Sequence, residues 1–236
     1  MDALSRRRFV VSAGVAAAGA LSAQSVLAQP AAGMPGPGLH QVAALKYPPE
    51  TVRGISAQVI TWHHDTHYAG YVKKRNQIEE QITRLGPGTP GFDGRVYAGI
   101  KRDEAFNASG MILHEVYFDN LGGDGKIGGG PAETALKSVF GSLEAWQADM
   151  IALAMQATGW ALMCYDPSDG RLHDYLVEAH QLGAIWGAVP IVALDVFEHA
   201  YYRDFGPDRA KYLPVFFDNL HWGRINERFR AATGVL

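Results

Sequence analysis

The sequence predicts an α+β fold, in which an N-terminal helical hairpin is followed by a small three-stranded antiparallel sheet domain with surrounding helices. Apolar residues recur every three or four positions from residue 56 to about 153 and then form dense runs of strand length. Between two of these runs lies Asp166-Pro167-Ser168-Asp169-Gly170, which has the residue types of a tight turn. Helices followed by strands, rather than alternating with them, indicate the α+β class.

The composition describes a globular protein with a packed core and argues against some functions. Of the 236 residues, 47% are hydrophobic and 19% are charged, so the chain can bury enough apolar surface to fold. No basic face stands out among the 21 basic and 24 acidic side chains, so we expect no nucleic-acid partner. The single cysteine, Cys164, excludes an internal disulfide framework and a cysteine-based zinc site.

Residues 1–28 are expected to be an export signal that is absent from the mature protein. Three arginines at 6–8 precede an Ala-rich apolar run over 9–21, and residues 26–28 offer a small-residue cleavage site. The arginine stretch resembles the bacterial twin-arginine signal, an address for the export of folded proteins. A membrane anchor is the alternative, but the apolar run is short and interrupted by glycine and serine. We therefore expect a periplasmic or otherwise exported protein without membrane contact after cleavage.

A proline- and glycine-rich lead-in over 29–50 is expected to lie extended on the surface before the first helix. Ser56 has the residue type of an N-cap for that helix. One stripe of the helix is predicted to face the core, because its members recur at spacings of three, four and seven. These members are Val59, Ile60, His63, His67, Tyr71 and Ile78.

Glycine and proline divide the helical part of the chain. The segment 86–100 is predicted to end the first helix and to link it to a second helix over about 103–118. A glycine cluster at 122–130 is expected to stop the second helix. The two helices would form an N-terminal helical-hairpin domain over 51–125.

The remaining chain, 131–236, predicts a C-terminal α/β domain. Pro131 suits the first turn of a third helix. Three apolar runs, at 159–165, 172–179 and 189–196, predict strands, and the first two form a hairpin. Short helices are expected to close the chain. The inner face of the third helix is predicted to carry Leu136, Val139, Phe140, Leu143, Trp146, Met150 and Leu153.

Two histidines and a tyrosine share one face of the first predicted helix. His63, His67 and Tyr71 follow one another at intervals of four residues, so their side chains line one stripe. A lone helix histidine is more often a core or surface residue than a ligand. This stripe alone therefore does not define a site.

Two other places in the sequence add imidazole and carboxylate groups. On the second helix, His114 lies on the inner face, with Gly110 one turn before it and Tyr117 nearly one turn after it. Near the end of the chain, Asp195 closes the third strand and His199 follows four residues later. Each pattern alone is common in proteins, and only the combination of the three is informative about function.

The combination resembles a known family. One sequence word is His63-His64-Asp65-Thr66-His67 followed by Tyr71, and the other is Asp195-Val196-Phe197-Glu198-His199-Ala200-Tyr201-Tyr202. In order and spacing they match the signatures of the iron/manganese superoxide dismutases, whose best-known pattern reads Asp-x-Trp-Glu-His-Ala-Tyr-Tyr. The resemblance covers nearly all of 50–230, with further landmarks at 140–142, 159–160 and 209–213.

The resemblance implies that His63, His114, Asp195 and His199 hold one manganese or iron ion. Three imidazoles and a carboxylate suit these metals, and the set lacks thiolates that superoxide would oxidise. The implied reaction disproportionates superoxide to oxygen and hydrogen peroxide while the metal alternates between trivalent and divalent states. Zinc accepts the same ligands but offers no redox change, and spacing alone does not exclude it.

The family also places a glutamine against the metal-bound solvent, from either the second helix or the sheet domain. Here the helix position is Gly110 and Gln181 takes the sheet position, an arrangement that slightly favours manganese. The adjacent His180 leaves the register open, because some members use histidine there. Tyr71 and His67 resemble the gateway pair at the mouth of the substrate funnel.

Other pocket positions combine family features with departures. Trp160 resembles a pocket wall, although plain core packing also explains it, and Tyr117 is expected nearby. Phe197 stands where most members have tryptophan, which keeps an aromatic wall but loses the indole N–H. Thr66 stands where many members have lysine, which removes a positive charge from the funnel. Arg209 remains as the candidate for guiding the anion.

Glu198 and Tyr202 resemble a bridge between two subunits. In the family arrangement each glutamate reaches a metal-ligand histidine of the partner, and each tyrosine reaches the partner's gateway histidine. The resemblance therefore implies a homodimer or a larger homo-oligomer. An exposed glutamate and tyrosine in a local surface turn is the alternative.

Two other functions stay open at this point. The departures at Phe197 and Thr66 allow a periplasmic metal-binding protein of the same fold with little or no dismutase activity. A zinc hydrolase with the same ligands fits less well, because Glu198 beside His199 is better explained by the subunit bridge and leaves no obvious free carboxylate base. The native metal and the choice between dimer and tetramer are not determined by the sequence.

Overall fold

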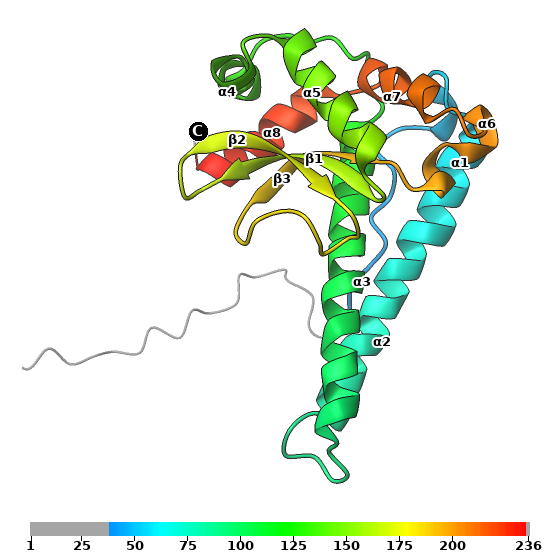
Figure 1. The fold of residues 1–236 in the computed structure, drawn as a ribbon. Helices are drawn as coiled ribbons and strands as arrows, with labels where there is room; N and C mark the ends of the chain where they lie inside the picture. Colours follow the sequence, from blue (N-terminus) through cyan, green and yellow to red (C-terminus); the bar gives the residue numbers. More distant parts are fainter. Residues whose placement is uncertain (1–37, 235–236) are drawn as a thin grey trace, which may run out of the picture. The chain divides into compact units, whose positions relative to one another are not determined.

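The computed structural model describes residues 38–234, and Figure 1 shows the arrangement of their helices and strands. The predicted export signal, its cleavage site and the first part of the lead-in lie outside the described residues. The described part of the lead-in has no helix or strand before a short 3-10 helix, η1 (Pro49–Thr51). Among the described residues, no helix is long and apolar enough to cross a membrane.

The first predicted helix consists of three consecutive helical segments. They are α1 (Ala57–Trp62), a π-helical turn η2 (His63–Tyr68) and α2 (Ala69–Leu85). The predicted N-cap is confirmed, because the Ser56 hydroxyl accepts a hydrogen bond from the Val59 backbone N–H at 3.3 Å. The π turn interrupts the regular α-helical spacing at the two predicted pocket histidines.

The second helix of the hairpin, α3 (Gly94–Asn120), packs along α2 (Figure 1). The predicted linker 86–100 is wrong at its C-terminal end, because the helix has already begun there. The cause is an N-cap: Asp93 Oδ1 accepts hydrogen bonds from the backbone N–H groups of Arg95 at 2.7 Å and Val96 at 3.3 Å. The hydrogen bonds of this N-cap outweigh the low helix propensity of the glycines in the first turns of α3.

The predicted third helix is two helices, α4 (Pro131–Phe140) and α5 (Leu143–Gln156). Its start at a proline is confirmed, but a single continuous helix is wrong. Gly141 has a φ of +85°, which an α-helix does not allow. Ser142 then begins a new helix, since its hydroxyl accepts a hydrogen bond from the Ala145 N–H at 3.1 Å.

The three predicted strands form one antiparallel sheet in the order β2-β1-β3. They are β1 (Trp160–Asp166), β2 (Arg171–Val177) and β3 (Val189–Asp195). The predicted hairpin turn is confirmed: the Gly170 N–H donates to the Asp166 carbonyl at 2.9 Å. The α+β class is therefore confirmed, with helices first and the sheet after them.

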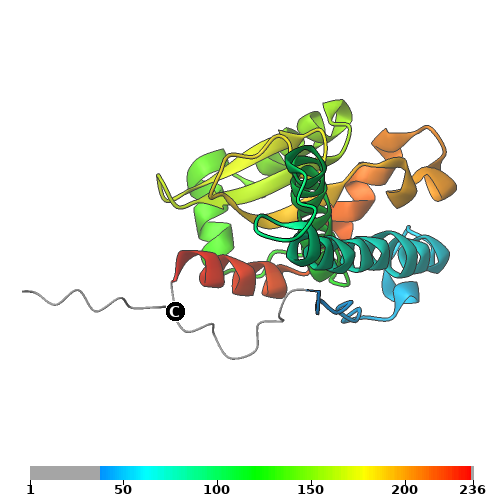
Figure 2. The same ribbon diagram turned by 90° about the horizontal axis from the view of Figure 1, so that it is seen from below.

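Helices surround the sheet and complete the chain. The C-terminal elements are η3 (Glu198–Ala200), α6 (Tyr202–Phe205), α7 (Arg209–Asp218) and α8 (Trp222–Thr233). Helix α3 packs against β3, whereas α5 packs against β1 and β2. Figure 2 shows the hairpin helices, in cyan and green, beside the yellow sheet. The hairpin and the sheet contribute to one hydrophobic core.

An asparagine at the end of α3 joins the hairpin to the sheet. The buried Asn120 donates from Nδ2 to the Ile191 carbonyl at 3.1 Å and accepts from the Ala193 N–H at 2.9 Å. Because β3 is an edge strand, these bonds satisfy backbone groups that the sheet leaves unpaired. They also fix the part of α3 that carries His114 against the strand that ends at Asp195.

Candidate metal centre

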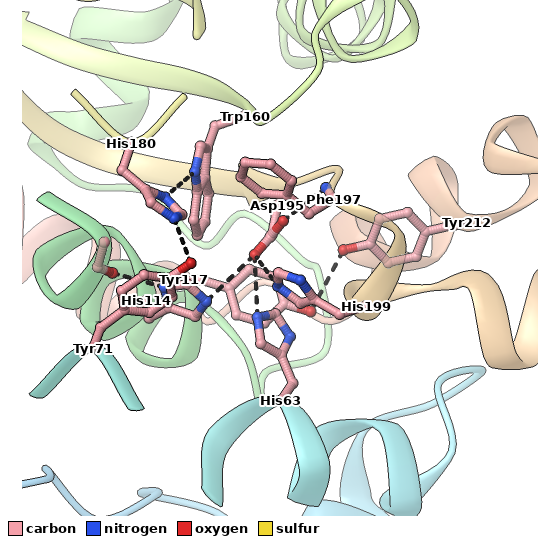
Figure 3. Close-up of polar contacts among 11 residues, drawn as sticks. His63, Tyr71, His114, Tyr117, Trp160, His180, Asp195, Phe197, His199 and Tyr212 are labelled. Atoms are coloured by element: carbon pink, nitrogen blue, oxygen red, sulfur yellow. Dashed lines mark hydrogen bonds and ion pairs between the residues drawn. The ribbon is translucent and has the colours of Figure 1, made fainter. Parts of the chain in front are cut away.

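The four side chains predicted as ligands meet in the interior, between the hairpin and the end of β3 (Figure 3). Each offers one ligand atom, and these atoms all lie within 4.8 Å of one another. His63 begins η2, His114 lies in α3, Asp195 ends β3 and His199 lies in η3. The first three are completely buried, and the side chain of His199 is 17% exposed. The fold thus brings together residues that are far apart in the sequence.

The carboxylate of Asp195 is central to the cluster. Its Oδ2 is 3.1 Å from Nε2 of both His63 and His199, and 3.7 Å from Nε2 of His114. Its Oδ1 accepts a hydrogen bond from the Phe197 backbone N–H at 2.9 Å, which orients the carboxylate. Ligands that bind one ion at about 2.1 Å are roughly 3 Å apart, so these spacings fit a shared ion.

The protonation states in the cluster favour a cation. Burial raises the pKa of Asp195, but the charge of His199 and hydrogen bonds with His199 and His63 outweigh burial and hold that pKa below its ordinary value. Burial lowers the pKa of His63 to about 4 and the pKa of His114 well below its ordinary value. At neutral pH the carboxylate is therefore ionised and these two imidazoles are neutral, as metal coordination requires.

The hydrogen bonds of the ligands also fit a metal ion. Nδ1–H of His114 donates to the Gly110 carbonyl at 2.7 Å, so the lone pair of this ring is on Nε2. Among the described residues, that buried Nε2 and Nδ1 of His63 have no hydrogen-bond partner. An unpaired buried acceptor costs about 1–3 kcal/mol, and coordination of an ion by Nε2 removes that cost. The donor set of imidazoles and carboxylate fits manganese or iron.

The π-helical turn positions His67 as well as the first ligand. Single π turns occur frequently at functional sites. The ring of His67 stacks on that of His199, with centroids 4.0 Å apart, and lies edge-on to His63 at 6.2 Å. His64 in the same turn is directed elsewhere, since its Nε2 contacts the Ala43 carbonyl at 2.8 Å. The turn therefore supplies one ligand and one residue at the edge of the cluster.

Tyr71 is connected to the sheet through a histidine. Its hydroxyl lies 2.7 Å from Nε2 of His180, whose Nδ1 accepts a hydrogen bond from the Trp160 indole N–H at 3.0 Å (Figure 3). The Tyr71 ring also lies 5.1 Å from that of His114. Burial raises the pKa of Tyr71, and the charge of Asp195 raises it further, so the phenol is protonated at neutral pH.

The structure corrects one predicted site residue. Gln181, expected to face the metal site, is exposed, whereas its neighbour His180 is only 5% exposed and contacts Tyr71. The register is therefore the one with histidine, and the expected manganese-type glutamine from the sheet is wrong. At the helix position, Gly110 leaves room for Tyr71, because a Cβ there would lie 2.8 Å from Cδ1 of the tyrosine.

Aromatic rings enclose the ligands. Phe197 lies nearly parallel to His199 at 5.7 Å, and Tyr117 lies 4.8 Å from His63. The hydroxyl of Tyr117 is 3.4 Å from that of Tyr212, a residue to which the sequence assigned no role. The expectation of an aromatic wall at 197 and 117 agrees with these contacts.

The sequence also missed Phe106. Its ring lies 4.6 Å from His180 and 6.1 Å from Tyr71. Phe106, Gly110 and His114 are spaced by four residues and so lie on one stripe of α3. This spacing is the signal that could have identified it.

Three residues with predicted roles either lie away from the cluster or make other contacts. Glu198 is exposed, and Tyr202 is 48% exposed. Nη1 of Arg209 donates to the carbonyls of Ala154 at 3.0 Å and Ala157 at 2.7 Å, at the end of α5. These bonds give Arg209 a structural role, and its guidance of an anion stays a prediction.

A cluster of three histidines and one aspartate, held between a helical hairpin and a three-stranded antiparallel sheet, defines a mononuclear metal-binding protein of the α+β class. Family models give its identity. The alpha-hairpin domain of the iron/manganese superoxide dismutases matches residues 40–122, and the C-terminal domain of the same family matches residues 129–228. The chain belongs to the iron/manganese superoxide dismutase family.

Individual relatives agree with this assignment. The chain is 42% identical over 181 residues to manganese superoxide dismutase 1 of Halobacterium salinarum, covering 75% of this chain and 88% of the relative. It is 38% identical over 198 residues to the iron superoxide dismutase of Cupriavidus metallidurans, covering 82% and 98%. It is 34% identical over 202 residues to the iron superoxide dismutase of Aquifex aeolicus, covering 83% and 94%. Similar proteins are thus named for either metal.

Proposed function

We propose that this chain is a superoxide dismutase, which converts two superoxide anions and two protons into oxygen and hydrogen peroxide. The observation that carries the proposal is the buried cluster of His63, His114, Asp195 and His199, whose ligand atoms lie within 4.8 Å of one another. Membership of the iron/manganese superoxide dismutase family supports it. When bound, a manganese or iron ion supplies one-electron oxidation and reduction at this cluster.

The ligands would hold the ion through their charge and their burial. Asp195 provides a fixed negative charge, which offsets the cost of placing a cation in the interior. The rings of His67 and Phe197 both stack on His199, and Trp160 is completely buried beside the cluster. A cation bound there would attract an anion such as superoxide.

Tyr71 is the side chain placed to deliver protons. The reaction consumes one proton for each superoxide, so a donor must lie beside the cluster. The phenol keeps its proton at neutral pH because its pKa is raised by burial, and its ring lies 5.1 Å from that of His114. His180 anchors the hydroxyl at 2.7 Å. His67, half-buried at the edge, is neutral at pH 7 because burial lowers its pKa.

We propose manganese and iron as the two candidate metals. The expectation of manganese depended on Gln181, which is exposed and does not support it. Elemental analysis with parallel activity assays of manganese- and iron-reconstituted protein tests both the metal and the function. We expect about one ion per chain and superoxide removal well above that of the same amount of free metal.

Two outcomes would overturn parts of the proposal. Full metal loading without activity above free metal would leave a metal-binding protein of the same fold. Exclusive retention of zinc after expression in mixed metals would remove the redox function altogether.

We propose further that two copies assemble across the surface of η3 and α6. Glu198 and Tyr202 are exposed there, and Glu198 directly precedes the ligand His199. Light scattering after size exclusion should show a dimer that Glu198→Ala dissociates, with a loss of retained metal. Glu80→Ala, an exposed glutamate on α2, is the control. A monomeric wild-type protein would overturn the assembly.

We propose that the chain is exported by the twin-arginine route. The support is the sequence of residues 1–28, with three arginines at 6–8 before an apolar run. Fractionation of cells that express the full chain should find mature protein in the periplasm. Replacement of the arginines by lysine should retain the protein in the cytoplasm, and a cytoplasmic wild-type protein would refute export.

A further inference from the structure

The turn between β1 and β2 carries a second group of potential metal ligands. The ligand atoms of Asp166, Asp169 and His173 all lie within 4.8 Å of one another. Asp166 ends β1, and β1 begins at Trp160, whose ring centroid lies 5.1 Å from that of the ligand His114. A strand of seven residues spans about 20 Å, so this group is separate from the metal centre.

Backbone pairing and the turn bring the three side chains together. Asp166 pairs with Arg171, and His173 lies two residues further along β2, so Asp166 and His173 point to the same face of the sheet. In the turn, Oδ1 of Asp166 accepts a hydrogen bond from the Ser168 N–H at 2.8 Å. Oδ1 of Asp169 accepts one from the Arg171 N–H at 2.9 Å. These bonds orient both carboxylates and leave their Oδ2 atoms for other partners.

The negative charge of Asp166 has no cationic partner. The residue is only 7% exposed, yet its Oδ2 has no hydrogen-bond partner in the described part of the chain. No lysine or arginine in that part of the chain forms an ion pair with Asp166 or Asp169, and the charge of Arg171 acts on Asp169 only at longer range. A buried carboxylate without a cation is costly, and a bound metal ion removes that cost.

Another histidine–carboxylate pair provides a contrast. Nε2 of His40 lies 2.8 Å from Oε1 of Glu79, the same distance that separates Nε2 of His173 from Oδ2 of Asp169. Glu79, however, also accepts a hydrogen bond from Nε of Arg75 at 2.9 Å, which compensates its charge. Among the described residues, the His40 pair is not part of a group of three potential ligands. A histidine beside a carboxylate is therefore not by itself a metal site.

We propose that Asp166, Asp169 and His173 bind a second metal ion, a divalent transition metal such as zinc. Zinc accepts carboxylate and imidazole ligands, and three protein ligands leave one position for water. The side chains of Asp169 and His173 are 41% and 37% exposed, so the ion enters from solvent. Coordination replaces the hydrogen bond between these two side chains and gives Asp166 a cationic partner. The proposal concerns binding alone and is independent of the proposed dismutase function.

Zinc binding to the manganese-loaded full chain tests the second site. Zinc and manganese are both measured by elemental analysis after equilibrium dialysis against Zn²⁺, so exchange at the metal centre is detected. We expect zinc to bind at about one ion per chain while the manganese content stays constant. A lack of bound zinc, or zinc that only replaces manganese, would overturn the proposal.

Three variants test the ligands. Asp166→Asn keeps an acceptor for the Ser168 N–H but removes the charge, and His173→Ala removes the imidazole. Each should weaken the affinity for zinc at least about tenfold and leave manganese in place. His40→Ala is the matched control and should bind zinc like the wild type. Wild-type affinity in either ligand variant would contradict the assignment.

Calcium distinguishes this site from a purely acidic cluster. Calcium takes oxygen ligands, whereas an imidazole favours transition metals. Zinc should therefore bind the wild-type protein at least about tenfold more tightly than calcium, and His173→Ala should remove most of this preference. Equal affinities of the wild-type protein for the two ions would show that the carboxylates act without His173, and the proposed ligand set would be wrong.

Discussion

Two aspartates, the completely buried Asp195 in the metal centre and the partly buried Asp174 between β2 and α5, respond differently to burial. Burial raises the pKa of both groups. At Asp195 the charge of His199 and hydrogen bonds with two imidazoles reverse the effect, and the pKa ends below its ordinary value. At Asp174 the carboxylate of Asp149 adds to burial, and the pKa rises to about 8 despite a hydrogen bond from Trp146.

The comparison shows that the partners of a buried carboxylate decide what it binds. Imidazoles surround Asp195 with lone pairs, so carboxylate and rings together suit a metal cation. A second carboxylate beside Asp174 favours retention of a proton, because two like charges at short distance are costly. The carboxylate in the metal centre is therefore ionised, whereas the carboxylate of Asp174 between α5 and β2 keeps its proton.

The largest expected effect is a difference in metal content between variants of the two aspartates. Asp195→Asn removes the negative ligand, and we expect metal affinity to fall by at least about 100-fold, with activity lost in proportion. Asp174→Asn is the matched control and should retain wild-type metal. Elemental analysis after dialysis against a chelator measures both. Full retention in Asp195→Asn would place the ion elsewhere, and His114→Ala should show the same loss as Asp195→Asn.

The second effect is on the pH dependence of stability. Asp174 has an ordinary pKa of 3.8 when unfolded and a pKa of about 8 when folded, so the folded state binds more protons between these values. Its contribution to stability is complete below about pH 4 and is lost as the pH rises through about 8. The stability of Asp174→Asn relative to the wild type should therefore increase between pH 5 and pH 9, by about 4 kcal/mol.

Urea unfolding at several pH values measures this effect as the difference between variant and wild type. The difference is the relevant quantity, because metal binding adds its own pH dependence to both proteins. A difference that does not change with pH would show that Asp174 is ionised in the folded protein at neutral pH. The contrast with Asp195 would then fail.

A third variant separates ion binding from proton supply inside the metal centre. Tyr71→Phe removes the hydroxyl but leaves the four ligands, so metal content should be unchanged. Turnover per bound metal should fall about tenfold, or product inhibition should change, because the pocket loses the proton donor beside His114. Tyr97→Phe, near the start of α3, is the control. Release of the ion by Tyr71→Phe would show that the ligand assignment is wrong.

The order of helices and strands could be predicted because periodicity and turn residues are local signals. The same signals failed where a single residue decides a boundary. Asp93 caps α3 earlier than the glycine pattern suggests, and Gly141 divides one apolar stripe between two helices. The side-chain pattern continues across Gly141, so only its backbone angle reveals the break.

Three ligands could be predicted because they lie in two short sequence words, and His114 because the family resemblance extends over its helix, but contacts between distant elements could not be predicted. Gln181 and His180 are neighbours in a loop after β2, and a shift of one residue exchanges the buried and the exposed side chain. No local pattern distinguishes the two registers. The pairing of Asp149 on α5 with Asp174 on β2 likewise depends on how the helix packs against the sheet.

The smallest expected effect tests which cause dominates at Asp174. Burial is the larger cause of its raised pKa, and Asp149 is the smaller one. Asp149→Asn removes the like charge but keeps the packing, so the pKa of Asp174 should fall and yet stay above 3.8. Stability at pH 9 should rise by only about 1 kcal/mol relative to the wild type, and Glu144→Gln on the same helix should have no such effect.

Titration of the ¹³C carboxyl signal of Asp174 in Asp149→Asn decides between the two causes. A pKa that stays well above its ordinary value means that burial alone keeps the group protonated, and the partners of the more deeply buried Asp195 must then overcome a desolvation cost at least as large. A pKa that returns to the ordinary value means that Asp149 dominates. In that case the charges of neighbouring groups determine the pKa of both aspartates, and burial only strengthens the effect of those charges.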